Sequence, residues 1–111
     1  MKILFDHGTP RPLKRELPGH SVDTAADKGW DRLANGDLIE SAEQDGYEIL
    51  ITTDQSIRHQ QNLADRRLAI IVLLSGAWPY TESRIEDIRA TVAQVQPGEL
   101  REVHIPMRGE P

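Results

Sequence analysis

The chain has 111 residues, no cysteine, and 18 Asp and Glu against 13 Lys and Arg, which gives a net charge of −5. This length suffices for one hydrophobic core and is too short for two, and the acidic balance disfavours a protein held on nucleic acid or an anionic membrane by its overall field. The absence of cysteine excludes disulfides and thiolate metal sites, and no apolar run approaches a membrane span, so we expect a soluble cytoplasmic domain over residues 1–105.

The first half of the chain predicts two strands and two helices. Residues 1–5 form a short apolar run, and residues 12–17 begin with a proline, which favours a short helix. Residues 21–24 follow a Pro-Gly turn and predict a second strand. Asn35 is a good N-cap for an amphipathic helix over residues 37–44.

The second half predicts a buried sheet with helices on both of its faces. Residues 48–52 and 68–74 are nearly continuous apolar runs, which is typical of parallel strands covered on both faces. Residues 82–95 predict a helix, and its apolar side chains fall on one face: Ile85, Ile88, Val92 and Val95. An edge strand is expected at residues 103–105 and a disordered tail at residues 106–111. The alternation predicts a three-layer α/β fold with a mainly parallel sheet flanked by helices.

Aspartates follow the predicted strands. Asp6 comes directly after the first strand, and Asp54 follows the strand at residues 48–52 across Thr53. Ligands of open parallel sheets bind outside the carboxyl ends of the strands, where two carboxylates and Asp37 could share Mg²⁺ or Mn²⁺. Clustered carboxylates repel one another, which would raise the pKa of at least one of them. The alternative is that each aspartate caps the helix that follows it.

Four segments then follow one another in a recognisable order. A strand runs into Asp6, an apolar helix with a central alanine occupies residues 35–42, a strand ends in Thr52-Thr53-Asp54, and a further apolar strand covers residues 69–74. In these motifs the chain resembles, over residues 1–95, the small stand-alone PIN-like proteins related to VapC-type ribonuclease toxins. Asn35 and Ser56 stand where the family pattern has acids, and His7-Gly8 stands where it has Glu-Asn.

The resemblance implies a PIN-like fold and a Mg²⁺- or Mn²⁺-dependent ribonuclease, the toxin of a toxin–antitoxin pair. It makes Asp6, Asp54 and Asp37 the expected catalytic and metal-binding residues. Candidate partners are an RNA substrate, an antitoxin protein and a second copy of the chain. Arg58, within the polar stretch 55–67, and Arg11 are the basic residues expected to approach phosphate, although such a stretch is also typical of a solvated helix face.

Two other functions stay open. One is a PIN-like binding module that has lost its chemistry. The other is a receiver-type phosphoacceptor domain. Such a domain would suit the position of Asp54 after a central strand and of Ser75-Gly76-Ala77 after a later strand. Receiver domains need an acidic pair after the first strand and a lysine after the last, whereas this chain has Asp6-His7 and no lysine after Lys28.

Overall fold

The computed structural model describes residues 1–59 and 66–106. Within them, the strands are β1 (Lys2–Phe5), β2 (Ser21–Thr24), β3 (Ile49–Thr52), β4 (Ala69–Leu73) and β5 (Leu100–Val103). The helices are the 3₁₀ helices η1 (Arg11–Glu16) and η2 (Gln55–His59) and the α-helices α1 (Asn35–Gln44), α2 (Trp78–Glu82) and α3 (Ile85–Gln94). All five strands are parallel and lie in the order β2-β1-β3-β4-β5.

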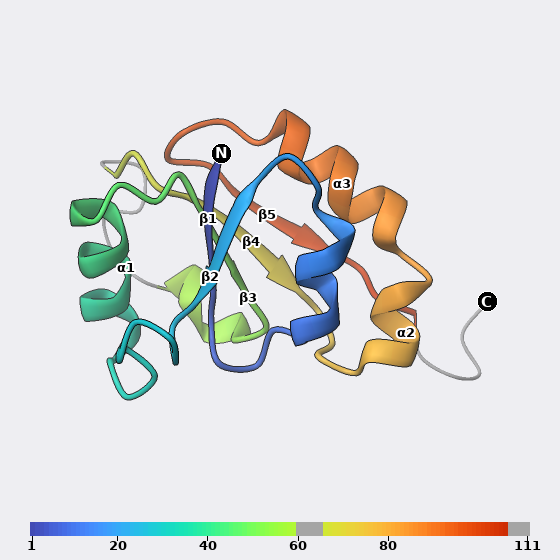
Figure 1. Ribbon diagram of the computed structural model, residues 1–111, viewed down its shortest axis with the longest axis horizontal. Coiled ribbons are helices and arrows are strands. Elements are labelled where there is room, and N and C mark those ends of the chain that lie inside the picture. Colours follow the sequence, from blue (N-terminus) through green and yellow to red (C-terminus); the bar gives the residue numbers. More distant parts are fainter. Residues whose placement is uncertain (60–65, 107–111) are drawn as a thin grey trace.

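Helices cover both faces of this sheet. Figure 1 shows α1 on one side of it and η1, α2 and α3 on the other. The predicted α/β class with a parallel sheet between helical layers is therefore confirmed. Within the described residues, none of the helices combines the length and the apolar character needed to cross a membrane.

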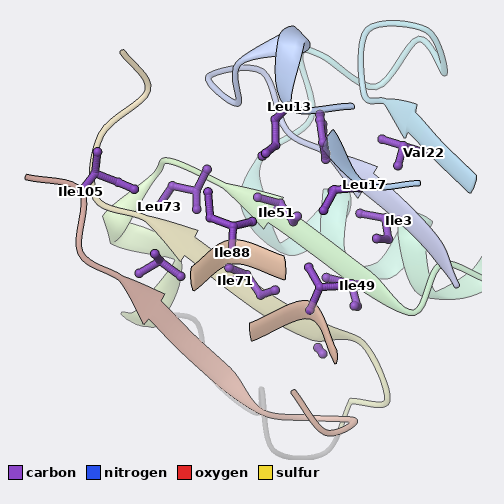
Figure 2. Packing of buried hydrophobic residues seen from close by; sticks show 14 residues of the cluster. Ile3, Leu13, Leu17, Val22, Ile49, Ile51, Ile71, Leu73, Ile88 and Ile105 are labelled. Carbon is purple, nitrogen blue, oxygen red and sulfur yellow. The ribbon is translucent and has the colours of Figure 1, made fainter. Parts of the chain in front are cut away.

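One face of the sheet packs against η1 and α3, as Figure 2 shows. Alternate residues of a strand point to the same face, so β1, β3 and β4 supply two or three side chains each to this layer, and β2 and β5 supply one each. The strands contribute Ile3, Phe5, Val22, Ile49, Ile51, Ala69, Ile71, Leu73 and Val103, the helices contribute Leu13, Ile88 and Val92, and Leu17 and Ile105 follow η1 and β5. All of them are buried, and this is the larger of the two apolar layers.

The opposite face packs against α1 and η2. The intervening strand residues form this layer, which contains Leu4, Leu50, Ile70 and Val72. The helices supply Leu38, Ile39 and Ala42 from α1, and Ile57 from η2. Because both faces of the central strands are covered, their sequences are continuously apolar rather than alternating.

The helix expected over residues 82–95 begins only at Ile85, so its predicted start is wrong, and Glu82 ends the separate helix α2. The amides of Ser83 and Arg84 bond to carbonyls three residues back, and the Ser83 hydroxyl donates to the carbonyl of Tyr80 at 2.6 Å. Such local side-chain bonds compete with a continuing helix. The helix therefore restarts at Ile85, which is half-buried, whereas Ile88 is fully buried.

Two further boundaries differ from the predictions. The edge strand covers Leu100–Val103 rather than residues 103–105, because the amides of Ile70 and Leu74 pair with the carbonyls of Glu99 and Val103. Helix α1 begins at Asn35 itself, with Ala34 as its N-cap. Residues 107–111 of the expected tail and residues 60–65 of the polar stretch lie outside the described residues.

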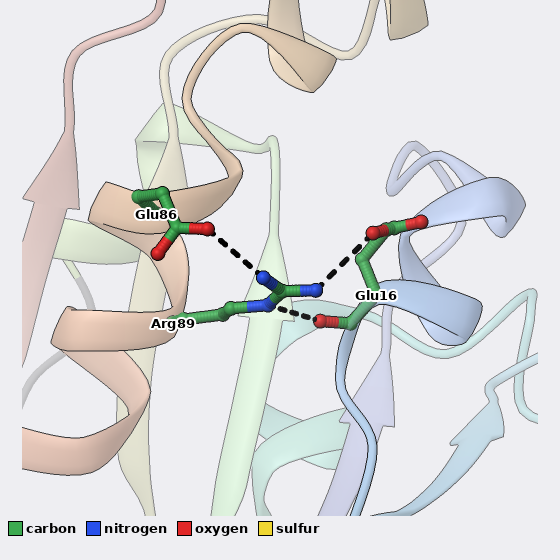
Figure 3. A network of polar contacts seen from close by, with 3 residues as sticks. All are labelled: Glu16, Glu86 and Arg89. Atoms are coloured by element: carbon green, nitrogen blue, oxygen red, sulfur yellow. Dashed lines mark hydrogen bonds and ion pairs between the residues drawn. The ribbon is translucent and has the colours of Figure 1, made fainter.

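A polar contact fastens α3 to the end of η1. The Nε of Arg89 donates to the backbone carbonyl of Glu16 at 2.7 Å, and its Nη2 lies 3.2 Å from the Glu16 carboxylate. Figure 3 shows that the same guanidinium also reaches Glu86, one turn earlier on α3, at 2.9 Å. Arg89 thus links η1 to α3, two of the helices that cover this face of the sheet.

The orientation of α3 can be tested by truncating two isoleucines of the same helix. Replacing Ile88, which is 0% exposed, with Ala should lower the free energy of unfolding by roughly 2–5 kcal/mol because it leaves a cavity. Ile85→Ala should cost clearly less, since that side chain is half-buried. Urea unfolding measures both, and equal losses would contradict the packing described above.

Candidate functional site

The candidate site lies where the connections leave the sheet in opposite directions. The chain passes from β1 to β2 toward one edge, and from β3 through β4 to β5 toward the other, so the order reverses between β1 and β3. Asp6 directly follows β1, and Asp54 comes two residues after β3. Open α/β sheets bind their ligands outside the carboxyl ends of the strands at such a reversal. The two aspartates therefore flank the position where this fold class places a ligand.

Thr52 joins the two segments that carry the aspartates. It is the last residue of β3 and is 0% exposed. Its hydroxyl donates to Oδ2 of Asp6 at 2.7 Å and accepts the backbone N–H of Asp54 at 3.0 Å. The Asp6 amide also donates to the carbonyl of Ile51 at 2.9 Å, so β1 and β3 remain bonded up to the first aspartate. Both aspartates are thereby tied to one buried side chain.

Asp54 is held by neutral donors. Its Oδ1 accepts the hydroxyl and the backbone N–H of Ser56 at 2.6 and 2.9 Å, and its Oδ2 accepts Nδ2 of Asn35 at 3.0 Å. The Ser56 hydroxyl above all, then the Asn35 amide, lowers the pKa of Asp54 below its usual value. This shift is opposite to the one that carboxylate repulsion would produce. Asp54 also caps the turn that begins η2, as the structural alternative predicted.

Asn35 acts across the site rather than as an N-cap. Its side chain bonds to Asp54 and lies 3.4 Å from the hydroxyl of Ser56, so it links the start of α1 to the turn after β3. Asn35 and Ser56 thus both contact the Asp54 carboxylate. Neither role was predicted, and no local sequence pattern reports a contact across 19 residues.

Three loops meet closely beside Asp6. A Cβ atom on Gly76, after β4, would lie 2.7 Å from the carbonyl oxygen of Gly8, after β1. A Cβ on Gly8 would collide in turn with the Thr53 hydroxyl, after β3. Only glycine allows this approach, which brings the ends of three strands together.

None of the other three predicted residues forms a hydrogen bond or ion pair with Asp6 or Asp54 in the described part of the chain. Asp37 is exposed in the first turn of α1, and its side chain makes no hydrogen bond or ion pair within the described part of the chain. Arg11 begins η1 and lies 4.0 Å from Asp27, with its side chain 73% exposed. Arg58, in η2, forms an ion pair with Glu102 of β5 at 3.0 Å.

Among residues 1–59 and 66–106, no three His, Cys, Asp or Glu side chains are placed to hold a metal ion together. Asp6, Asp37 and Asp54 thus do not form a three-carboxylate centre in this structure. Metal binding by these residues stays a prediction.

Comparison with known proteins assigns no function. No family model matches the chain, and no curated protein or solved structure matches it significantly.

The Asp54 contacts predict a pH-dependent stability. A carboxyl whose pKa is lowered by folding stabilises the fold above its unfolded value of about 3.9, and this contribution is lost as the pH falls through the folded value. We expect Asp54→Ala to destabilise the protein at pH 7 by about 0.5–2 kcal/mol, the usual effect of a lost cap. Asp54→Asn should destabilise the protein less than Asp54→Ala, because the new carbonyl can still accept the bonds from Ser56. It should remain less stable than the parent, because the new amide would face the amide of Asn35.

Urea unfolding at pH 7 and at about pH 3 measures these differences, which should shrink at the lower pH as Asp54 becomes protonated. An Asp54→Asn protein more stable than the parent at pH 7 would contradict the favourable contacts and support carboxylate repulsion.

Proposed function

We propose that the chain is a PIN-like, Mg²⁺- or Mn²⁺-dependent ribonuclease, related to the toxins of VapC-type toxin–antitoxin pairs. The observation that carries the proposal is that Asp6 and Asp54, the two acids shared with the family pattern, are linked through the buried hydroxyl of Thr52. They lie at the sheet position where α/β folds bind ligands.

The donors at this position suit a single hard cation. Carboxylate oxygens are the ligands that Mg²⁺ and Mn²⁺ prefer, and Asp6 and Asp54 would hold the ion. When bound, it would polarise a phosphoryl oxygen and favour ionisation of a water. Thr52 fixes the Asp6 carboxylate, and Asn35 and Ser56 fix that of Asp54. Asp37, which bonds to neither aspartate, keeps the proposed role of a base that positions water.

Two arginines on opposite layers of the sheet are the proposed phosphate contacts. Arg11 begins η1, and Arg58 belongs to η2, which packs on the other face of the sheet. Guanidinium groups pair well with the phosphates of a single-stranded nucleic acid, even where the whole protein is acidic. We propose them as contacts for the RNA backbone.

One observation favours a second function, that of a binding module without chemistry. Neutral Asn35 and Ser56 occupy the hydrogen-bonding positions around Asp54, where the family pattern has acids. With fewer carboxylates, the affinity for a divalent ion falls, because ligand charge sets that affinity. Such a module would keep the fold and bind a partner protein.

Metal-dependent stabilisation and RNA cleavage test the proposal together. In the parent protein, Mn²⁺ should raise the thermal midpoint and support cleavage of a fluorescent single-stranded RNA. Asp6→Asn should abolish the shift and slow cleavage by about a hundredfold or more, since several kcal/mol of transition-state stabilisation depend on the ion. Asp87→Asn, the same charge change on α3, is the control and should behave as the parent.

A parent protein that neither responds to Mn²⁺ nor cleaves RNA would contradict the ribonuclease and support the binding module. Labelling by acetyl phosphate that is lost in Asp54→Asn would instead indicate a receiver-type phosphoacceptor.

A further inference from the structure

Arg58 pairs with an acid of the edge strand β5 rather than with Asp54. Its Nη1 is 3.0 Å from Oε2 of Glu102, and the two side chains are 46% and 38% exposed. Asp54 is only four residues earlier in the chain, yet within the described residues it forms no ion pair and is held by Asn35 and Ser56. The guanidinium is therefore directed away from the candidate site.

The sheet register places Glu102 at the level of the site. Glu102 pairs with Val72 of β4, and Val72 pairs with Thr52 of β3. Neighbouring strands are about 4.8 Å apart, so the backbones of Glu102 and Thr52 are separated by about 10 Å. Both residues belong to the sheet face that η2 covers, because they alternate with residues of the opposite layer. Arg58 thus reaches from η2 over this face toward the edge strand.

We propose that Glu102 competes with substrate phosphate for the guanidinium of Arg58 and so limits RNA binding. This inference rests on the proposed function. A phosphate that approaches the site displaces Glu102 from Arg58 and pairs with the arginine in its place.

The exchange needs little free energy because the pair is exposed. Ion pairs of this kind contribute little to stability, so a phosphate can take the place of the Glu102 carboxylate as the partner of Arg58. Removing Glu102 removes both the competitor and a negative charge near the bound phosphate. We expect Glu102→Gln to tighten RNA binding by about two- to fivefold, the range that corresponds to such a pair.

Binding of a fluorescein-labelled oligouridylate at low salt, with EDTA present to prevent cleavage, tests this inference. Glu99→Gln is the matched control, because Glu99 also pairs with an arginine, Arg101, at 3.1 Å. It changes the net charge equally but lies at the amino end of β5, away from the aspartates. Glu102→Gln should tighten binding, whereas Glu99→Gln should leave it unchanged.

A double-mutant cycle separates a role through Arg58 from a general effect of charge. In an Arg58→Gln background, Glu102→Gln should no longer tighten binding, and the thermal midpoints of all variants should stay close to that of the parent. A gain that persists without Arg58, or that Glu99→Gln reproduces, would overturn the inference while leaving the ribonuclease proposal intact. A parent protein that does not bind the oligonucleotide in EDTA would overturn this inference, whereas cleavage in the presence of Mn²⁺ decides the ribonuclease proposal separately.

Discussion

The parallel pairing of β1 with β3 is the contact on which both the fold and the candidate site depend. Ile3 pairs with Ile49 and Phe5 with Ile51, and all four side chains are buried in the same layer. Parallel pairing brings the carboxyl ends of both strands to one edge, so the residues that follow each strand become neighbours. The apolar pairing inside the sheet thus determines which polar residues meet outside it.

Thr52 continues this pairing beyond the apolar residues. A buried hydroxyl without a partner is unfavourable, and Thr52 satisfies its own by donating to Asp6 and accepting from the Asp54 amide. If either aspartate were displaced, the buried Thr52 hydroxyl would lose one of its two hydrogen bonds. The requirement that buried polar groups be paired therefore fixes the Asp6 carboxylate relative to the backbone of Asp54.

Apolar runs made the sheet predictable, whereas contacts between distant segments did not follow from sequence. The runs around Leu4, Ile51 and Ile71 indicated buried parallel strands, and Asp6 and Asp54 were placed correctly after β1 and β3. Thr52 carried a usable signal, as a polar residue on the buried face of an apolar strand. The break before α3, however, depends on the Ser83 hydroxyl, and the contact of Asn35 with Asp54 depends on how α1 packs.

The charges around the site follow one physical logic. Asp54 keeps its negative charge because neutral donors, Ser56 and Asn35, stabilise it, and Arg58 pairs elsewhere. An arginine on Asp54 would stabilise the carboxylate equally well but would cancel the negative potential of the site. Neutral donors preserve that potential, which would favour a cation beside the aspartates. The proposed metal and RNA contacts therefore have one requirement in common, that the arginines pair with phosphate and leave the carboxylates of Asp6 and Asp54 to the cation.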